Sequence, residues 1–142
     1  MKDSYDPTAN SFKTYVVAII FNIKAKKILI GLCKKDPNFP GLNWAFPAGR
    51  PNYDEELEDY LKKHVGESTG LDIESLGTIF AKTYSENRKA LSIYYLCEVI
   101  GGKEKAGGEM TKLKWVDPEE LEEHFKPFSL HKKLKEYIMN LK

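Results

Sequence analysis

Cysteine is scarce in this sequence, which contains only 2 among its 142 residues. Cys33 and Cys97 stand far apart, without a CxxC pair or a nearby histidine, so their spacing excludes the usual structural zinc sites. We interpret both as buried free thiols rather than as a disulfide pair. Because free thiols are typical of a reducing compartment, we expect a cytoplasmic protein.

Long apolar runs and arginine are also lacking. The longest apolar run, Tyr15 to Phe21, is far too short to span a bilayer, and the N-terminal residues show no signal-peptide pattern. The 22 Lys and Arg residues against 21 Asp and Glu residues leave a formal charge of +1, too balanced to predict a nucleic-acid polymer or a membrane as partner. Apart from Arg50 and Arg88 these cations are lysines, so few side chains can bind an anion in the bidentate manner of arginine.

What the sequence does contain is typical of a compact globular protein, with 42% hydrophobic and 30% charged residues. We expect residues 1–11 to form a flexible N-terminal leader and residues 12–142 to form a single domain. Segments rich in β-branched and aromatic residues predict strands at 12–23, 27–33, 44–46, 73–84, 89–100 and 111–116. Short turn-prone connections join the first two of these, and the pair 73–84 and 89–100, into hairpins.

Helices are predicted between and after these strands. The first helix begins near Asn52 or Asp54 and ends at Gly70. Its apolar stripe consists of Leu57, Tyr60, Leu61 and Val65. A second helix is predicted from 117 to about 124 and an amphipathic third over 128–141. The order of strands, helix, strands and helices lacks βαβ alternation and predicts an α+β sandwich around a mixed sheet.

A spaced set of residues runs through the loop and first predicted helix. Its members are Gly49, Glu55, Lys63, His64, Val65, Glu67, Ser68, Gly70 and Leu71. This set resembles the signature of the Nudix hydrolases: G, five residues, E, seven residues, R-E, an aliphatic residue, any residue, E-E, any residue, G and an aliphatic residue. Six of the nine defined positions agree. Lys63 keeps the charge of the family's arginine, whereas His64 and Ser68 replace two glutamates.

The resemblance continues outside this motif. Residues 40–49 resemble the family's proline-rich approach to its loop, and residues 114–117 resemble its late strand followed by a helix. Together these segments cover most of residues 12–125. The resemblance implies the Nudix fold, an α/β/α sandwich around a mixed β-sheet.

The resemblance also implies a metal site. Positions 64, 67 and 68 lie three and four residues apart, so a helix presents them on one face. In the family this face holds three carboxylates, which suit Mg²⁺. Here it presents His64, Glu67 and Ser68. We expect Glu67, Glu109 and the carbonyl of Gly49 to hold Mg²⁺ or Mn²⁺, with Glu109 in the loop where many relatives place a further glutamate.

Catalytic roles are predicted for Glu67, Glu109 and His64 on the same grounds. His64 is a candidate imidazole ligand for a transition metal, or a base with a pKa near the operating pH. A structural interpretation stays open beside the functional one: His64 as a helix residue facing solvent, and Glu109 as an ordinary glutamate of a surface loop.

Substrate contacts are predicted for Arg50, Lys63, Arg88 and Tyr53, the last as a ring that stacks on a base. By analogy with the family, Glu55 is expected to form an ion pair with Lys63. Further aromatic candidates for stacking are Phe39, Trp44 and Tyr84. His124 and His131 have no cluster spacing, and we expect them at the surface.

The functional prediction is a pyrophosphohydrolase that depends on a divalent metal. It would cleave a nucleoside triphosphate, or a nucleoside diphosphate linked to another group, so its partner would be a small nucleotide. The alternative is a domain of this fold that binds nucleotides or regulates without catalysis, because two anionic ligands are missing at His64 and Ser68. A monomer or a homodimer is expected.

Overall fold

The computed structural model describes residues 13–34, 44–83, 89–126 and 129–141. The expected leader at 1–11 lies outside these ranges, and so do the candidates Phe39, Tyr84 and Arg88. No helix within the described ranges is long and apolar enough to cross a membrane.

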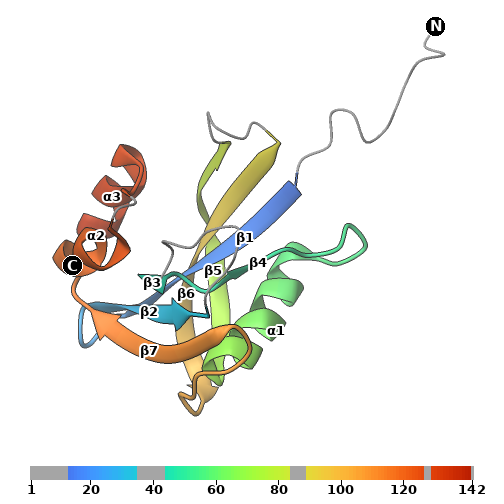
Figure 1. Ribbon diagram of the computed structural model, residues 1–142, viewed down its shortest axis with the longest axis horizontal. Helices are drawn as coiled ribbons and strands as arrows, with labels where there is room; N and C mark the ends of the chain where they lie inside the picture. The colour runs from blue at the N-terminus through green and yellow to red at the C-terminus, as the bar shows by residue number, and fades with distance from the viewer. Residues whose placement is uncertain (1–12, 35–43, 84–88, 127–128, 142) are drawn as a thin grey trace, which may run out of the picture.

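A seven-stranded sheet forms the centre of the molecule (Figure 1). Its strands are β1 (Lys13–Asn22), β2 (Lys27–Cys33), β3 (Trp44–Ala45), β4 (Ala48–Gly49), β5 (Leu71–Thr83), β6 (Ala90–Gly102) and β7 (Met110–Val116). The main path runs β3-β2-β1-β6-β5, while β4 pairs with β1 and β7 pairs with β2. The β1–β6 pair is parallel and the other pairs are antiparallel, so the sheet is mixed. Both predicted hairpins, β1–β2 and β5–β6, are confirmed.

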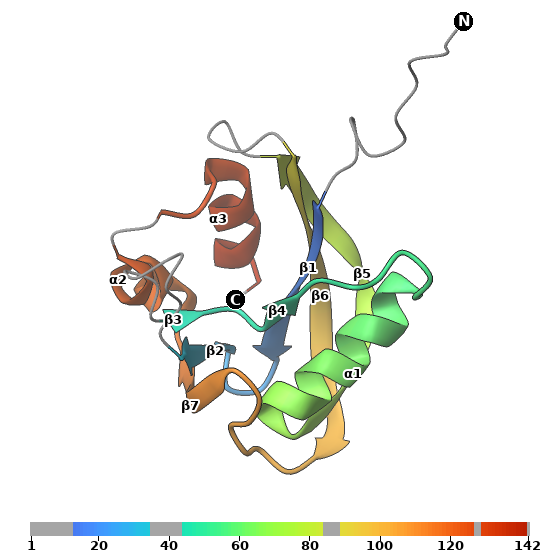
Figure 2. The ribbon, with the colours of Figure 1, turned by 45° about the vertical axis from the view of Figure 1, so that its right-hand side comes forward.

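Helices cover both faces of this sheet (Figure 2). Helix α1 (Leu57–Thr69) lies on one face, and α2 (Leu121–Phe125) and α3 (Lys132–Met139) lie on the other. A short 3₁₀ turn, Pro118–Glu120, leads into α2, as the Asp-Pro pair predicts.

The two layers of core follow from the alternation of side chains along the central strand β1. Val17, Ile19 and Phe21 belong to the buried cluster on the α2 and α3 side. The alternate residues Val16, Ala18 and Ile20 belong to the cluster that packs against α1. Successive side chains of a strand point to opposite faces, so one continuous apolar run supplies both layers. The predicted α/β/α sandwich around a mixed sheet is confirmed.

The predicted helix boundaries need correction. Helix α1 starts at Leu57, later than expected, because residues 52–55 close a separate turn. In that turn the backbone N–H of Glu55 donates to the Asn52 carbonyl at 3.0 Å, and the Asn52 N–H donates to the Glu55 carboxylate at 2.8 Å. The end at Gly70 is confirmed: this glycine has φ +75° and its N–H donates to the Gly66 carbonyl. Helix α3 is shorter than expected, starting at Lys132 after a cap by His131.

Candidate functional site

The first component of the site is the contact between strand β4 and helix α1. Gly49 pairs with Val16 of β1, which places its Cα against the rings of Tyr60 and His64. A Cβ at this position would overlap the Tyr60 hydroxyl and lie 3.1 Å from the His64 ring. A side chain at position 49 would therefore displace the Tyr60 hydroxyl and crowd the His64 ring, which favours glycine where the strand and helix approach.

The second component is the loop between β6 and β7, which caps the C-terminal end of α1. Three backbone N–H groups of the loop donate to carbonyls that the helix leaves unpaired: Lys103 to Gly70 at 3.1 Å, Lys105 to Thr69 at 2.7 Å and Gly107 to Ser68 at 3.0 Å. The last carbonyls of a helix have no partner within it, so the loop supplies one for each. These bonds hold the loop against the helix and bring Glu109 next to His64.

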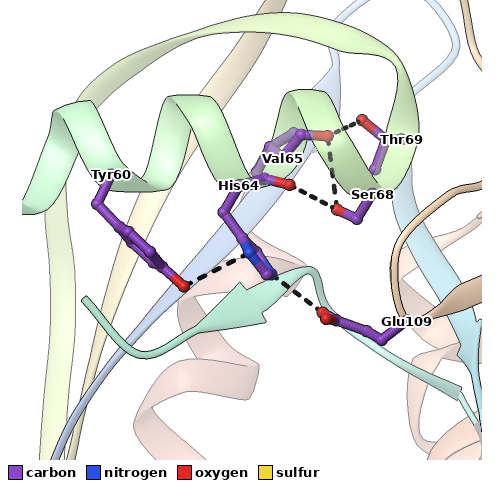
Figure 3. A network of polar contacts seen from close by, with 6 residues as sticks. All are labelled: Tyr60, His64, Val65, Ser68, Thr69 and Glu109. Atoms are coloured by element: carbon purple, nitrogen blue, oxygen red, sulfur yellow. Dashed lines mark hydrogen bonds and ion pairs between the residues drawn. The ribbon is translucent and has the colours of Figure 1, made fainter. Parts of the chain in front are cut away.

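The centre of the site is the pair formed by His64 and Glu109 (Figure 3). The Nε2 atom of His64 lies 3.0 Å from Oε1 of Glu109. The imidazole is stacked on the Tyr60 ring, with centroids 5.5 Å apart and planes 16° from parallel. The Tyr60 hydroxyl lies 3.5 Å from Nδ1, at the outer limit of hydrogen bonding. The histidine side chain is only 15% exposed, against 47% for Glu109.

The two groups shift each other's titration. The hydrogen bond to Glu109 raises the pKa of His64, and burial opposes this shift. The hydrogen bond to His64 lowers the pKa of Glu109, again against the effect of burial. Both shifts favour the ion pair of imidazolium and carboxylate.

Ser68 points away from this centre. Its side chain is buried at 1% exposure, and its hydroxyl donates to the His64 carbonyl at 3.0 Å (Figure 3). Thr69 bonds in the same way to the Val65 carbonyl at 2.7 Å. Both hydroxyls are thus used inside the helix.

Glu67 is exposed on the same helix. Its negative charge contributes to the raised pKa of His64, so the carboxylate lies within electrostatic range of the ring. Its backbone carbonyl faces Gly107, where a Cβ would come within 2.6 Å of the oxygen.

The residues predicted to contact substrate do not form a cluster comparable to that of Gly49, His64 and Glu109. The Arg50 guanidinium lies over the ring of Tyr15, 5.6 Å from its centroid, and the residue is exposed. Lys63 is exposed on α1. Tyr53 is 105% exposed, on the turn before the helix. Arg88 lies outside the described residues.

Several smaller expectations are corrected. Within the described part of the chain, Glu55 makes no ion pair with Lys63, because its carboxylate accepts the Asn52 N–H in the turn. His124 and His131 are half-buried, so each lies only partly at the surface. The ring of His124 packs edge-on against Trp44, and that of His131 packs on Phe80. The Trp44 ring is accordingly part of the core on the α2 side.

The donor set fits a resident metal ion poorly. Among the described residues, no group of three or more His, Cys, Asp or Glu side chains is placed to hold a metal. The residues here therefore do not form the three-carboxylate cluster that the motif resemblance implies.

Tyr60 is the member of the site that sequence reasoning missed. The sequence pattern places it on the apolar stripe of the helix, where it does pack against the α1-side cluster. Its position four residues before His64 was the available signal, because side chains at i and i+4 meet on one helix face.

Comparison with known proteins adds to this geometry. A sequence model described as NUDIX domain matches residues 12–141. A MutT-like protein of Streptomyces ambofaciens is 28% identical over 82 residues, which are 56% of this chain and 51% of the relative. The chain thus spans about half the length of the curated relative that it matches.

Solved structures resemble the whole fold. A MutT protein of Methanosarcina mazei Go1 has a TM-score of 0.70 at 19% identity, with 94% of each chain covered. A NUDIX hydrolase of Nitrosomonas europaea has a TM-score of 0.74 at 18% identity, covering 90% of this chain and 70% of its own. An ADP-ribose pyrophosphatase of Streptococcus suis has a TM-score of 0.63 at 24% identity, with 75% of each covered. At these identities the likeness concerns the fold.

Proposed function

Because the chain belongs to the NUDIX family, we propose that it is a hydrolase of the phosphoric anhydride bond in a small nucleotide derivative. The substrate class is a nucleoside triphosphate, or a nucleoside diphosphate linked to another group. The observation that carries the proposal is the meeting of Gly49, His64 and Glu109, from three separate segments, at the motif helix. The ADP-ribose pyrophosphatase among the structural neighbours supports the same class.

In the proposed reaction, a water oxygen attacks one phosphorus of the anhydride. The bond from that phosphorus to the bridging oxygen breaks, and the other phosphate leaves as an anion. Glu109 is the proposed acceptor of the water proton, because one of its oxygens is held by His64 while the side chain remains 47% exposed to water. The lowered pKa of Glu109 makes it a weak base, so we expect a slow enzyme.

The cations near this pair have a proposed binding role. His64 in its charged form would face the negative charge that develops on the phosphate. Arg50 and Lys63 are proposed to neutralise the flanking phosphate oxygens, and Tyr53 to contact the base. All three side chains are exposed, and Arg50 would have to leave the Tyr15 ring to reach a ligand.

Hydrolases of this family generally use divalent metals such as Mg²⁺, and Mg²⁺ or Mn²⁺ was our expectation for this chain. The described residues do not supply the matching donors, so the chemistry above is derived from protein groups alone. The test therefore compares turnover with and without added metal.

The test is a hydrolysis screen of nucleoside triphosphates, nucleotide sugars, ADP-ribose and dinucleoside polyphosphates. Each is assayed with Mg²⁺, with Mn²⁺ and with chelator, and products are separated by chromatography. We expect turnover of at least one substrate and its loss by about 10²-fold or more in Glu109→Gln. Glu104→Gln is the matched control, because Glu104 lies in the same loop but accepts from the Trp115 indole at 2.7 Å. No turnover of any substrate, or equal turnover in both variants, would overturn the proposal.

A second candidate function is nucleotide binding without turnover. It is favoured by Ser68, whose hydroxyl is turned into the helix where the family has a carboxylate. Calorimetry would then show binding of ADP-ribose of similar affinity with chelator and with Mg²⁺, in samples that release no product.

A further inference from the structure

We infer that the motif face of helix α1 holds no resident divalent cation, and that the His64–Glu109 pair instead uses this face to fasten the 103–109 loop to the helix. The inference goes beyond the proposed function: it concerns the same helix face, but it follows from the geometry of the donor groups and does not require turnover.

Position 68 offers no ligand. Ser68 is 1% exposed, and its hydroxyl lies 3.0 Å from the His64 carbonyl and 3.5 Å from the Val65 carbonyl. A metal ligand must present a lone pair to the ion from an accessible side. The Ser68 oxygen is instead covered by protein and directed along its own helix.

Position 64 offers no ligand either. Imidazole binds a metal through the lone pair of a ring nitrogen. The carboxylate of Glu109 accepts hydrogen bonds, so Nε2 of His64, 3.0 Å away, carries a hydrogen in this contact. The ring is also fixed, because Tyr60 stacks on it and Gly49 lies close to its edge. His64 therefore cannot offer Nε2 to an ion without losing that hydrogen and breaking the pair, and its Nδ1 faces the Tyr60 hydroxyl at 3.5 Å.

The remaining donors are too few. Glu109 uses one oxygen on His64, and Glu67 stands exposed on the helix. A divalent cation such as Mg²⁺ is bound by carboxylates in near-octahedral geometry, and its affinity depends on ligand charge and number. In the part of the chain that the structure describes, no three acidic, histidine or cysteine side chains gather around one point.

The same contact has a structural consequence for the loop. Backbone bonds from Lys103, Lys105 and Gly107 fasten the loop to the end of α1, and the His64–Glu109 pair adds a side-chain contact one helical turn earlier. The Glu109 carbonyl in turn accepts the Lys34 N–H at 2.8 Å, which joins the loop to the end of β2. A protein ion pair thus adds to the backbone bonds that hold the loop on the helix.

The direct test is electron paramagnetic resonance of Mn²⁺ added in equimolar amount to the full chain without nucleotide. The expected result is the full six-line signal of free Mn²⁺. A signal reduced by binding in the wild-type chain, and restored in Glu109→Gln, would overturn the inference.

Variants at position 64 test whether His64 is the residue that keeps Mn²⁺ from binding to this helix face. His64→Glu frees Glu109 and places three carboxylates on one face with Glu67, so it is expected to reduce the free Mn²⁺ signal. His64→Gln is the matched control of similar size without the charge, and it should leave the signal unchanged. The double variant His64→Glu with Ser68→Glu should bind Mn²⁺ more tightly still. Circular dichroism first establishes that this variant folds with a glutamate at the buried position 68. A folded His64→Glu that binds no Mn²⁺ would contradict the role given to His64.

These results are separable from the hydrolase proposal. Turnover without Mn²⁺ binding by the free protein supports both. No turnover and no Mn²⁺ binding removes the hydrolase proposal and leaves the inference standing. Mn²⁺ binding together with turnover removes the inference alone.

Discussion

The His64–Glu109 pair gives the molecule a pH dependence whose sign follows from the two shifts. The pKa of His64 is raised from 6.5, so its contribution to stability is complete below about pH 6.5 and is lost as pH rises through the folded-state pKa. The pKa of Glu109 is lowered from 4.5, so its contribution is complete above about pH 4.5 and is lost as pH falls through the folded-state pKa. The loss of unfolding free energy in Glu109→Gln should therefore be greatest between about pH 4.5 and 6.5.

Urea unfolding of both proteins from pH 3.5 to 9 measures this difference. Glu104→Gln is again the control, because its indole partner does not titrate in this range. A difference between wild type and Glu109→Gln that stays constant across the whole range would show that the pair is not charged.

The two thiols should differ in reactivity. Cys97 is 1% exposed, its Sγ donates to the Tyr95 carbonyl at 3.7 Å, and burial raises its pKa to about 12. Cys33 is half-buried, and burial followed by the Glu109 charge raises its pKa as well. Since the thiolate is the reactive form, a chromogenic disulfide reagent at pH 8 should modify Cys33 slowly and Cys97 only after denaturation. Two rapidly reacting thiols in the folded protein, or a fast one in Cys33→Ser, would contradict this.

The residues of the site that belong to a motif could be identified from the sequence. Gly49 and His64 could be selected by the spacing of the motif, and Glu109 by its place in the loop where many relatives have a further glutamate; the structure brings the three together. The partner of each side chain was not predictable. The pairing of His64 with Glu109 depends on how the loop closes on the helix, and that closure is made by backbone bonds which carry no side-chain signal.

At the scale of elements, the β2–β7 pair depends on a glycine. Gly31 of β2 is buried opposite β7, and a Cβ on it would overlap the sulfur of Met110 and lie 2.7 Å from its Cε. Met110 is itself 3% exposed, so its side chain has little room to move. Gly31→Ala should destabilise the protein by about 1–3 kcal/mol through overpacking.

Double-mutant analysis tests this cause. Met110→Ala alone should cost about 2–5 kcal/mol through the cavity it leaves, and Gly31→Ala with Met110→Ala should cost less than the sum. Gly66→Ala is the control glycine, because it is exposed in α1 and an added Cβ there has its nearest neighbour at 3.8 Å. It should stabilise by up to about 1 kcal/mol through helix propensity. Additive effects of the Gly31 and Met110 changes would show that the two residues do not compete for space.

Element positions were predicted better than element ends. The apolar run of β1 and the turn at Gly70 carry strong local signals, and both were predicted correctly. The predicted start of α1 at Asn52 or Asp54 was wrong because the Asn52 backbone and Glu55 close a turn of their own, and the helix begins after Glu56, which makes no side-chain cap. A residue suited to capping does not reveal which turn it closes.

For the whole molecule, the sandwich was predictable but its central pairing was not. Alternation and element order indicate a mixed sheet with helices, whereas the parallel register of β1 with β6 joins residues about 77 positions apart, such as Lys13 and Ala90. That pairing makes β1 the shared strand of both layers. The layers therefore depend on each other, since removing either one exposes the same strand to water.

This interdependence predicts that the two layers unfold as one cooperative unit. The sequence contains 2 tryptophans, and they report on opposite layers: Trp44 packs against the cluster on the α2 and α3 side, and Trp115 packs against the cluster on the α1 side. Trp115→Phe leaves the first reporter and Trp44→Phe leaves the second. Within each variant, urea unfolding followed by fluorescence should coincide with unfolding followed by far-ultraviolet circular dichroism.

Comparing two probes within the same variant removes the effect of the substitution on stability. Ile19→Ala and Ile20→Ala extend the test, because these fully buried neighbours on β1 belong to opposite clusters. Each should lower the unfolding free energy by about 2–5 kcal/mol and shift both probes together. A fluorescence transition that precedes the dichroism transition in one variant alone would mean that one layer opens while the other persists. The shared strand β1 would then not couple them, and the region would behave as two units joined by a sheet.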